Sequence, residues 1–329
     1  MNNSLTSILE ILLITYNRSA CLDNTLRQLS ESPFAQCRLT VLDNCSTDDT
    51  PNVIASYKNQ FTNYRIIRHH MNIGGDYNFL RAVELSTSYY TWILCDDDNY
   101  DFSRADEVIT AIESKSFYLI YTKSRITDDA LDWSGYGATT VKKLIKDNAR
   151  YHTACTFWPS FVFRTDRWVD ECFYDAPYLF PSMKFINRSV KFDFSIYVPK
   201  AGIVIRSTVT AISDTPLHFY KEWVENASQI SDRKLRAYVI EQWTDKGFLK
   251  TLAFWIAVDR SKKANGYWKR LVDIMFALTP AQKIRFLMLF PLMLIPLPIQ
   301  FLIRAREFVY RLMGQKDASM LPPVDAEHR

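Results

Sequence analysis

The chain has 329 residues, of which 48% are hydrophobic and 23% are charged, and its formal net charge is +4. A chain of this length and composition can form a hydrophobic core, which excludes a disordered or very polar protein. The net charge is too small to argue for nucleic acid as a partner. The six cysteines form no CxxC pair, which favours reduced and mostly buried thiols over a disulfide framework or a zinc site.

The first 125 residues alternate between strand and helix signals. Short apolar runs predict strands, and apolar residues at helical spacing predict the helices between them. We expect strands at 8–14, 38–44, 64–69, 89–95 and 117–122, and helices at 22–29, 50–61 and 76–86. This α/β alternation predicts a Rossmann-like, mostly parallel central sheet with helices on both faces.

Polar residues follow the first four predicted strands at their carboxyl ends. Parallel strands bring these ends to one edge of a sheet, where ligands of such folds bind. The sequence therefore predicts one site at that edge, formed by Thr15, Tyr16 and Asn17, by Asp43 and Asn44, by 69–75, and by Asp96, Asp97 and Asp98.

Three consecutive carboxylates, Asp96 to Asp98, stand directly behind an apolar strand in "WILCDDDNY". Such carboxylates raise one another's pKa unless a cation neutralises them. Mg²⁺ and Mn²⁺ prefer oxygen ligands and often bridge carboxylates to phosphates. The run therefore predicts a divalent cation and a diphosphate ligand, although the sequence has neither a Walker loop nor GxGxxG. A solvated turn that caps a helix is the alternative interpretation.

Four stretches in order resemble family 2 glycosyltransferases of the GT-A fold: "LLITYNR" (12–18), "TVLDNCSTDDT" (40–50), "HHMNIGGDYNFLRAVE" (69–84) and "YTWILCDDD" (90–98). The resemblance covers roughly the first 125 residues. It implies inverting transfer of a sugar from a UDP-, GDP-, CDP- or dTDP-sugar, with Mn²⁺ or Mg²⁺ as cofactor. It also implies a bacterial surface-polysaccharide enzyme.

The resemblance implies roles by position. Asp43 would accept a hydrogen bond from the base ring. Asp96 and Asp98 would form the DxD pair that holds the metal, with Asp97 as the alternative ligand because three aspartates leave the register open. The Arg that many relatives carry near Asn78 is absent, so Arg81 or Asp76 would substitute. The expected nucleotide-sugar-binding residues are Thr15, Tyr16, Asn17, Asp43, Asn44, Ser46, Asn72, Gly74, Asn78, Asp96 and Asp97.

An inverting transfer also needs a general base that deprotonates the acceptor hydroxyl. The stretch "WVDECFYDAPYLFP" (168–181) offers Asp170, Glu171 and Asp175, of which we favour Asp175; a surface or helix-capping role is the alternative. Trp158 is expected to stack on an acceptor sugar, with a core aromatic as an equal alternative.

We expect a glycosyltransferase domain at 1–215 and a C-terminal helical region at 216–329, with a membrane-associating segment at 284–312. Residues 286–303 carry no charge but contain three prolines, which argue against a straight spanning helix. Basic residues flank both ends, which favours a segment that lies in the interface of an anionic leaflet. A true span and a buried core or oligomer contact remain alternatives.

This tail predicts a peripheral or monotopic protein on the cytoplasmic face of the bacterial inner membrane. Its acceptor would be a lipid-linked glycan, such as a polyprenyl-diphosphate oligosaccharide of O-antigen, capsule or exopolysaccharide assembly. A catalytically inactive nucleotide-sugar-binding scaffold is the alternative, because no candidate base stands in a clean motif. A nucleotidyltransferase is less favoured, because no glycine-rich basic loop follows the first strand.

Overall fold

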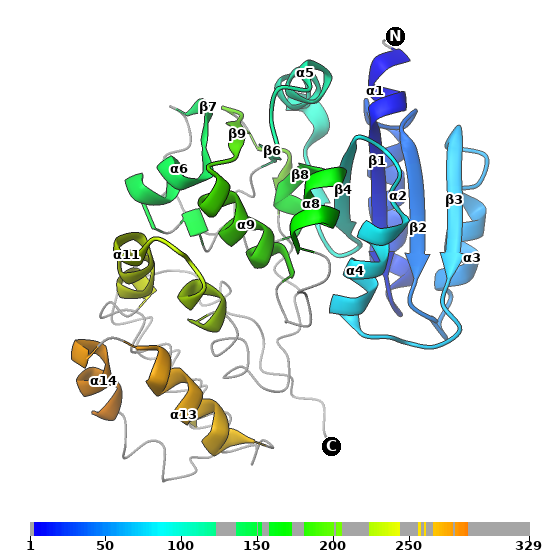
Figure 1. Cartoon of the computed structure of the whole chain (residues 1–329). Helices are drawn as coiled ribbons and strands as arrows, with labels where there is room; N and C mark the ends of the chain where they lie inside the picture. The colour runs from blue at the N-terminus through cyan, green and yellow to red at the C-terminus, as the bar shows by residue number, and fades with distance from the viewer. Residues whose placement is uncertain are drawn as a thin grey trace, which may run out of the picture. The chain divides into compact units, whose positions relative to one another are not determined.

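A computed structural model describes residues 3–122, 136–149, 151–152, 158–172, 181–200, 202–205, 224–243, 256–257, 260, 266–278 and 280–288. The chain divides into two compact units, Met1–Ser207 and Thr208–Arg329. Figure 1 shows the elements of both units.

The first half of the sheet is parallel. Its strands are β1 (Leu9–Thr15), β2 (Arg38–Asp43), β3 (Asn63–Arg68) and β4 (Tyr90–Cys95), in the spatial order β3-β2-β1-β4. The connecting helices are α2 (Ser19–Ser30), α3 (Thr50–Ser56) and α4 (Gly75–Leu85). The predicted alternation of strands and helices is thus confirmed as far as residue 95.

The second half of the sheet is mixed, so the expectation of a mostly parallel sheet holds only for the first half. β8 (Phe161–Arg164) lies between β4 and β6 (Leu119–Tyr121) and runs antiparallel to both. β9 (Ser195–Val198) is parallel to β6, and β7 (Gly137–Thr140) is antiparallel to β9. The fifth predicted strand therefore exists as β6, but β8 separates it from β4.

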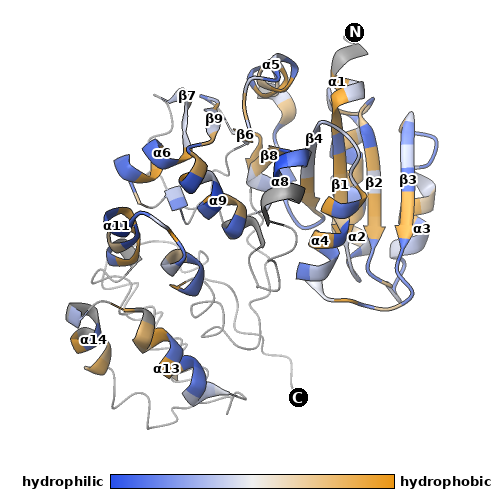
Figure 2. Cartoon of the chain, viewed as in Figure 1, coloured by the Kyte–Doolittle hydropathy of each residue, from blue (hydrophilic) through white to orange (hydrophobic). Residues whose placement is uncertain are grey.

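Helices cover both faces of this sheet. One face packs against α1 (Asn3–Ile8), α2, α3 and α5 (Asp106–Ser114), and the other against α4, α8 (Thr165–Cys172) and α9 (Pro181–Phe192). Every residue of β1 is buried, as two covered faces require. The hydropathy colouring agrees with this arrangement: β1 and β2 are mainly apolar, and the helices combine apolar and polar residues (Figure 2).

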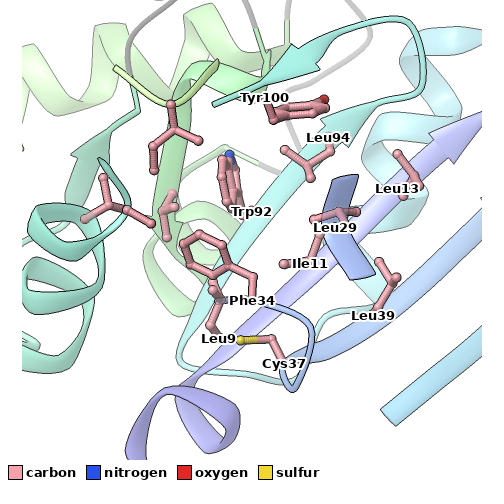
Figure 3. Close-up of a cluster of buried hydrophobic side chains, with 14 of the residues drawn as sticks. Leu9, Ile11, Leu13, Leu29, Phe34, Cys37, Leu39, Trp92, Leu94 and Tyr100 are labelled. Carbon is pink, nitrogen blue, oxygen red and sulfur yellow. The ribbon is translucent and has the colours of Figure 1, made fainter. Parts of the chain in front are cut away.

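The core around β1 and β4 is aromatic and aliphatic (Figure 3). Trp92 is fully buried and packs edge-to-face on Phe34 with 5.3 Å between ring centroids. Trp92 Nε1 also donates a hydrogen bond to the carbonyl of Pro159, which ties β4 to the segment that precedes β8. This core fixes the carboxyl ends of the central strands.

The other elements of the first unit are short. They are η1 (Phe102–Arg104), α6 (Val141–Asp147), η2 (Trp158–Ser160), and a two-stranded sheet of β5 (Asn99–Tyr100) and β10 (Val204–Ile205). α1 was not expected from the sequence, which predicted a strand from residue 8. Because β5 follows the aspartate run directly, its pairing places 204–205 beside the expected site.

The second unit contains α11 (Arg233–Trp243), α13 (Tyr267–Ala277) and α14 (Pro280–Leu287). Among the residues that the structure describes, no helix is both long enough and apolar enough to span a membrane. Of the expected membrane-associating segment 284–312, residues 284–288 are described and the remainder lies outside the described residues.

Candidate active site

The register of the parallel strands places three side chains in one row at the carboxyl edge. Arg68 of β3 pairs with Asp43 of β2, and Asp43 pairs with Thr15 of β1. On the other side of β1, Ile14 pairs with Cys95, so the next residue of β4, Asp96, adjoins Thr15. The Thr15 hydroxyl donates a hydrogen bond of 2.6 Å to Asp96 Oδ2, and both residues are buried.

Two side chains hold the Asp96 carboxylate. Besides Thr15, it has a partner in Arg18, whose Nη1 lies 3.2 Å from Asp96 Oδ1 and 2.7 Å from Asp97 Oδ2. Burial raises the pKa of Asp96 to about 6, although the hydrogen bond from Thr15 and the charge of Arg18 act in the opposite direction. The site thus holds one carboxylate at a considerable desolvation cost.

The backbone of the aspartate run is fixed from α2 and β5. The Thr25 hydroxyl donates a hydrogen bond of 3.0 Å to the carbonyl of Asp96. The Tyr100 hydroxyl donates to the carbonyl of Cys95 at 2.7 Å, and the Tyr100 amide donates to Gln28 Oε1 at 2.8 Å. Sequence reasoning missed Arg18, Thr25 and Tyr100; the cation in "TYNR" at the end of β1 was the available signal for Arg18.

The aspartate run also contains a group suited to a divalent cation. Ligand atoms of Cys95, Asp97 and Asp98 lie within 4.8 Å of one another. Two carboxylates are the oxygen ligands that Mg²⁺ and Mn²⁺ prefer. Burial and the nearby carboxylates raise the pKa of the Cys95 thiol well above its ordinary value, so the thiol contributes little to a hard cation. The carboxylates therefore fit such an ion; Asp96 lies outside this group, and its role as a ligand stays a prediction.

The loops after β1 and β2 are joined by hydrogen bonds. The Asn17 amide donates to Ser46 Oγ at 2.9 Å, and Asn17 Oδ1 accepts from the Thr47 amide at 2.7 Å. Asn17 has a φ of 49°, a left-handed conformation that asparagine tolerates better than most residues. The expected binding residues Asn17 and Ser46 thus belong to one rigid junction, and Tyr16 beside them is 40% exposed.

The Asp43 side chain holds the loop that follows β2. Its Oδ1 accepts a hydrogen bond of 2.8 Å from the Ser46 amide, and its Oδ2 lies 3.5 Å from Arg68 Nε. Arg68 Nη2 in turn donates to the Ser46 carbonyl at 2.6 Å. Asp43 Oδ2 is buried and accepts no hydrogen bond from the described part of the chain, so one acceptor remains at this position. The expected contact of Asp43 with a base ring stays a prediction.

Asn44 links the end of β2 to the loop after β3. Its Nδ2 donates to Asn72 Oδ1 at 2.8 Å and to the Gly74 carbonyl at 3.3 Å, and its Oδ1 accepts from the Ile73 amide at 3.0 Å. Gly74 has a φ of 85° and a ψ of 160°, a conformation that side chains disfavour. The structure therefore brings Asn44, Asn72 and Gly74 together, as the sequence predicted for one edge of the sheet.

For the remaining expected residues, the structure shows packing contacts or gives no side-chain position. Asn78 is buried in α4, and its Oδ1 lies 2.9 Å from His69 Nε2. Trp158 packs on Phe79 of α4 with 4.6 Å between ring centroids. Asp170 and Glu171 lie in α8, where their side chains are not described, and Asp175 lies outside the described residues. The roles of these five residues stay predictions.

A sequence model of the family described as "Glycosyl transferase family 2" matches residues 10–189, which is more than half of the chain and runs from the second residue of β1 to beyond α8. The chain belongs to glycosyl transferase family 2. The resemblance seen in the sequence is thereby confirmed.

One curated relative of this family 2 chain is similar over a limited stretch. It is the abequosyltransferase RfbV of Salmonella typhimurium (strain LT2), 36% identical over 88 residues. The aligned stretch spans about a quarter of each chain, 26% in both cases.

Solved structures share the fold over most of their length. TarS of S. aureus (residues 1–349) superposes with a TM-score of 0.63 at 16% identity, covering 87% of this chain and 88% of that one. The mannosyltransferase PcManGT of Pyrobaculum calidifontis, solved with GDP-Man and Mn²⁺, gives 0.54 at 13% identity, covering 94% and 88%. At these identities the likeness shows a shared fold, that of GT-A glycosyltransferases.

Proposed function

We propose that this family 2 chain is a glycosyltransferase that moves a sugar from a nucleoside diphosphate-sugar to an acceptor hydroxyl, with inversion and with Mn²⁺ or Mg²⁺. The observation that carries the proposal is the position of Asp96–Asp98. They stand at the carboxyl end of β4, in the same row as Thr15 and Asp43. In open α/β sheets a nucleotide binds at this edge.

The nucleotide end of the donor would lie over the joined loops of β1 and β2. Asp43 Oδ2 is the remaining acceptor there, and the Tyr16 ring is exposed beside it. The nucleotide is a UDP-, GDP-, CDP- or dTDP-sugar; S. aureus TarS has been solved with UDP-GlcNAc and PcManGT with GDP-Man, which supports this class of donor. Asn72 and Gly74 would form the floor under the ribose and sugar.

Asp98 and Asp97 would hold the divalent cation, and Asp96 would hold the ribose or share the cation. When bound, the ion supplies positive charge that stabilises the departing diphosphate. Thr15 orients Asp96, and the bonds from Thr25 and Tyr100 keep the backbone of the run in place. These contacts preorganise the site before the donor arrives.

The acceptor hydroxyl needs a base, and Asp175 is the residue that we favour over Asp170 and Glu171. A carboxylate on the acceptor side would take the hydroxyl proton while the oxygen attacks the anomeric carbon from the face opposite the diphosphate, which inverts that carbon. Trp158 would support the acceptor sugar. Its packing on Phe79 holds the indole ring in place, which is compatible with a sugar platform.

A lipid-linked glycan is the proposed acceptor, in O-antigen, capsule or exopolysaccharide assembly at the cytoplasmic face of the bacterial inner membrane. The name of the similar Salmonella protein, an abequosyltransferase, supports the transfer of a sugar. An apolar stripe on α13 supports contact with a membrane. Trp268, Val272 and Phe276 are exposed at a spacing of four residues, and Ile284 and Leu287 of α14 and the following Met288 are exposed too.

A thermal-shift screen of nucleoside diphosphate-sugars with Mn²⁺ tests the proposal. We expect one class of donor to raise the melting temperature of the wild type and to lose this effect in Asp98→Ala. Asp106→Ala, an exposed aspartate in α5, is the matched control and should respond like the wild type. Stabilisation that persists unchanged in Asp98→Ala would contradict the site.

The alternative function is an inactive scaffold that binds the same donor. It is kept because the side chains of the candidate bases are not described. Donor hydrolysis or transfer with Mn²⁺ separates the two functions. A donor that binds but is neither hydrolysed nor transferred, across a panel of lipid-linked acceptors, would favour the scaffold.

A further inference from the structure

The positively charged side chain of Arg18 lies within the aspartate run, where the proposed divalent cation would also bind. Its Nη1 lies between two carboxylates, 2.7 Å from Asp97 Oδ2 and 3.2 Å from Asp96 Oδ1. The carboxylate side chains are 11% and 4% exposed, whereas the Arg18 side chain is 40% exposed. The guanidinium therefore reaches into the aspartate run from the solvent side.

The backbone of Arg18 is held independently of this ion pair. Its amide donates to Thr50 Oγ1 at 3.3 Å, and its carbonyl accepts the first main-chain hydrogen bond of α2, from the Leu22 amide at 2.9 Å. The two carboxylates are thus what positions the end of the side chain. The guanidinium can turn away from them without any change in the backbone of the site.

Asp97 is shared between two possible cations. Its carboxylate is the closer partner of Arg18, and it also belongs to the Cys95, Asp97 and Asp98 group that fits a divalent ion. Two positive charges placed a few ångströms apart in a partly buried site repel strongly. Arg18 and the ion therefore compete for the same carboxylate.

We propose that Arg18 is an internal counter-cation of the aspartate run: it neutralises Asp96 and Asp97 in the ligand-free protein and must leave Asp97 when the metal binds. This inference rests on the proposed metal-dependent function. Metal alone then binds weakly, because it has to displace the guanidinium. A nucleoside diphosphate offers the displaced guanidinium a new anionic partner, so metal and nucleotide bind cooperatively.

The test measures Mn²⁺ binding to the full-length chain by electron paramagnetic resonance, without substrate and without any activity readout. Arg18→Gln should bind Mn²⁺ about tenfold more tightly than the wild type, since it removes one positive charge next to the ion. Arg18→Lys keeps the charge and should stay within about threefold of the wild type. The control is Arg27→Gln, because Arg27 pairs with Glu31 on the exposed side of α2 and should leave the affinity unchanged.

The cooperativity is measured in the same series with UDP and GDP. Nucleoside diphosphate should tighten Mn²⁺ binding in the wild type and should do so several-fold less in Arg18→Gln. Equal or weaker Mn²⁺ binding by Arg18→Gln, relative to the wild type, would overturn the proposal. If Arg18→Gln does not fold, the guanidinium ¹⁵N resonances of the wild type during a Mg²⁺ titration replace it, with Arg18→Lys used for assignment. An Arg18 signal that Mg²⁺ leaves unchanged would then overturn it.

The two proposals fail in different ways. If Arg18→Gln gains Mn²⁺ affinity but no nucleotide sugar stabilises any variant, Arg18 is the counter-cation and the glycosyltransferase assignment of the site is wrong. If a nucleotide sugar binds with metal and Arg18→Gln gains no Mn²⁺ affinity, the site stands and Arg18 is not a counter-cation.

Discussion

At the scale of one residue, the raised pKa of Asp96 lowers the stability of the ligand-free fold at neutral pH. Its folded pKa of about 6 lies above the ordinary value of 3.8, because burial disfavours the charged form more than Thr15 and Arg18 favour it. For an acid whose pKa is raised on folding, stability is greatest at low pH and is lost as the pH rises through the folded pKa. The ligand-free protein therefore carries a cost at neutral pH, which the proposed cation would offset if Asp96 shares it.

Asp96→Asn should make the ligand-free protein more stable at pH 7.5. Two pKa units correspond to about 3 kcal/mol, and the gain should shrink to near zero below about pH 3, where the carboxyl is protonated in both the folded and the unfolded chain. Urea unfolding of wild type and variant across this pH range measures the difference. An Asp96→Asn protein no more stable than the wild type at pH 7.5 would show that the carboxylate is not strained.

The sequence could not assign a separate role to each of the three aspartates. The strand ends predicted that Thr15, Asp43 and Asp96–Asp98 share one edge, and the register confirms that they do. Three equal residues in a row carry no information about side-chain direction, however. That direction depends on partners distant in the sequence, such as Thr15 and Arg18, which come almost 80 residues or more earlier in the chain.

At the scale of elements, Asn44 joins the ends of β2 and the loop before α4. Its side chain is 3% exposed and makes three hydrogen bonds to residues 72–74. Asn44→Ala would remove these three part-buried hydrogen bonds, at about 0.5–1.5 kcal/mol each.

Asn44→Ala should therefore lower the free energy of unfolding by about 2–4 kcal/mol and weaken donor binding, because the floor formed by Asn72 and Gly74 loses its support. Chemical denaturation and donor titration measure the two effects. Asn52→Ala is the control, since Asn52 is an exposed asparagine of α3 whose side chain bonds only to Asp49 in the described structure. Equal stability of the two variants would contradict the role of Asn44.

His152 ties the segment after α6 to α9. It is fully buried, and its Nε2 lies 2.9 Å from Asn187 Oδ1 of α9. Burial lowers the pKa of His152 to about 4. A histidine buried in its neutral form stabilises the fold above its unfolded pKa of about 6.5, and this stability is lost as the pH falls towards the folded value.

His152→Gln keeps a polar partner for Asn187 but cannot take up a proton. Between pH 7 and pH 4, the free energy of unfolding should fall by about 3 kcal/mol less in the variant than in the wild type. The contribution of Asp96 has the opposite sign, because it makes the protein less stable as the pH rises. Unfolding at several pH values compares the two slopes. Parallel pH profiles of wild type and variant would rule out His152 as the acid-sensitive group.

At the scale of the whole molecule, the sequence predicted the first half of the sheet better than the second. Strands β1, β2 and β4 are largely apolar runs, and single helices lie between the first four strands, so local patterns were enough. The second half depends on pairings between distant segments: β8 lies between β4 and β6, and β9 pairs with both β6 and β7. Periodicity within one segment says nothing about such partners.

Membrane binding by the C-terminal segment is a second property of the whole molecule that can be tested. Deletion of residues 283–329 should release the protein from membranes, because it removes the uncharged run 286–303, its basic flanks and the exposed apolar residues of α14. Sedimentation with anionic and with neutral vesicles measures binding. A truncated protein that still sediments with anionic vesicles would place the membrane contact elsewhere, and Trp268 and Phe276 of α13 would be the next residues to replace.

The position of β8 also has a consequence for how the protein is made. β4 is complete when Cys95 is synthesised, but its outer edge stays unpaired until Phe161–Arg164 follows, roughly 65 residues later, which takes several seconds at about 5–20 residues per second. During those seconds an apolar strand edge faces other nascent chains. The yield of folded protein in cells should therefore depend on translation speed and on ribosome-associated chaperones more than on the stability of the finished fold.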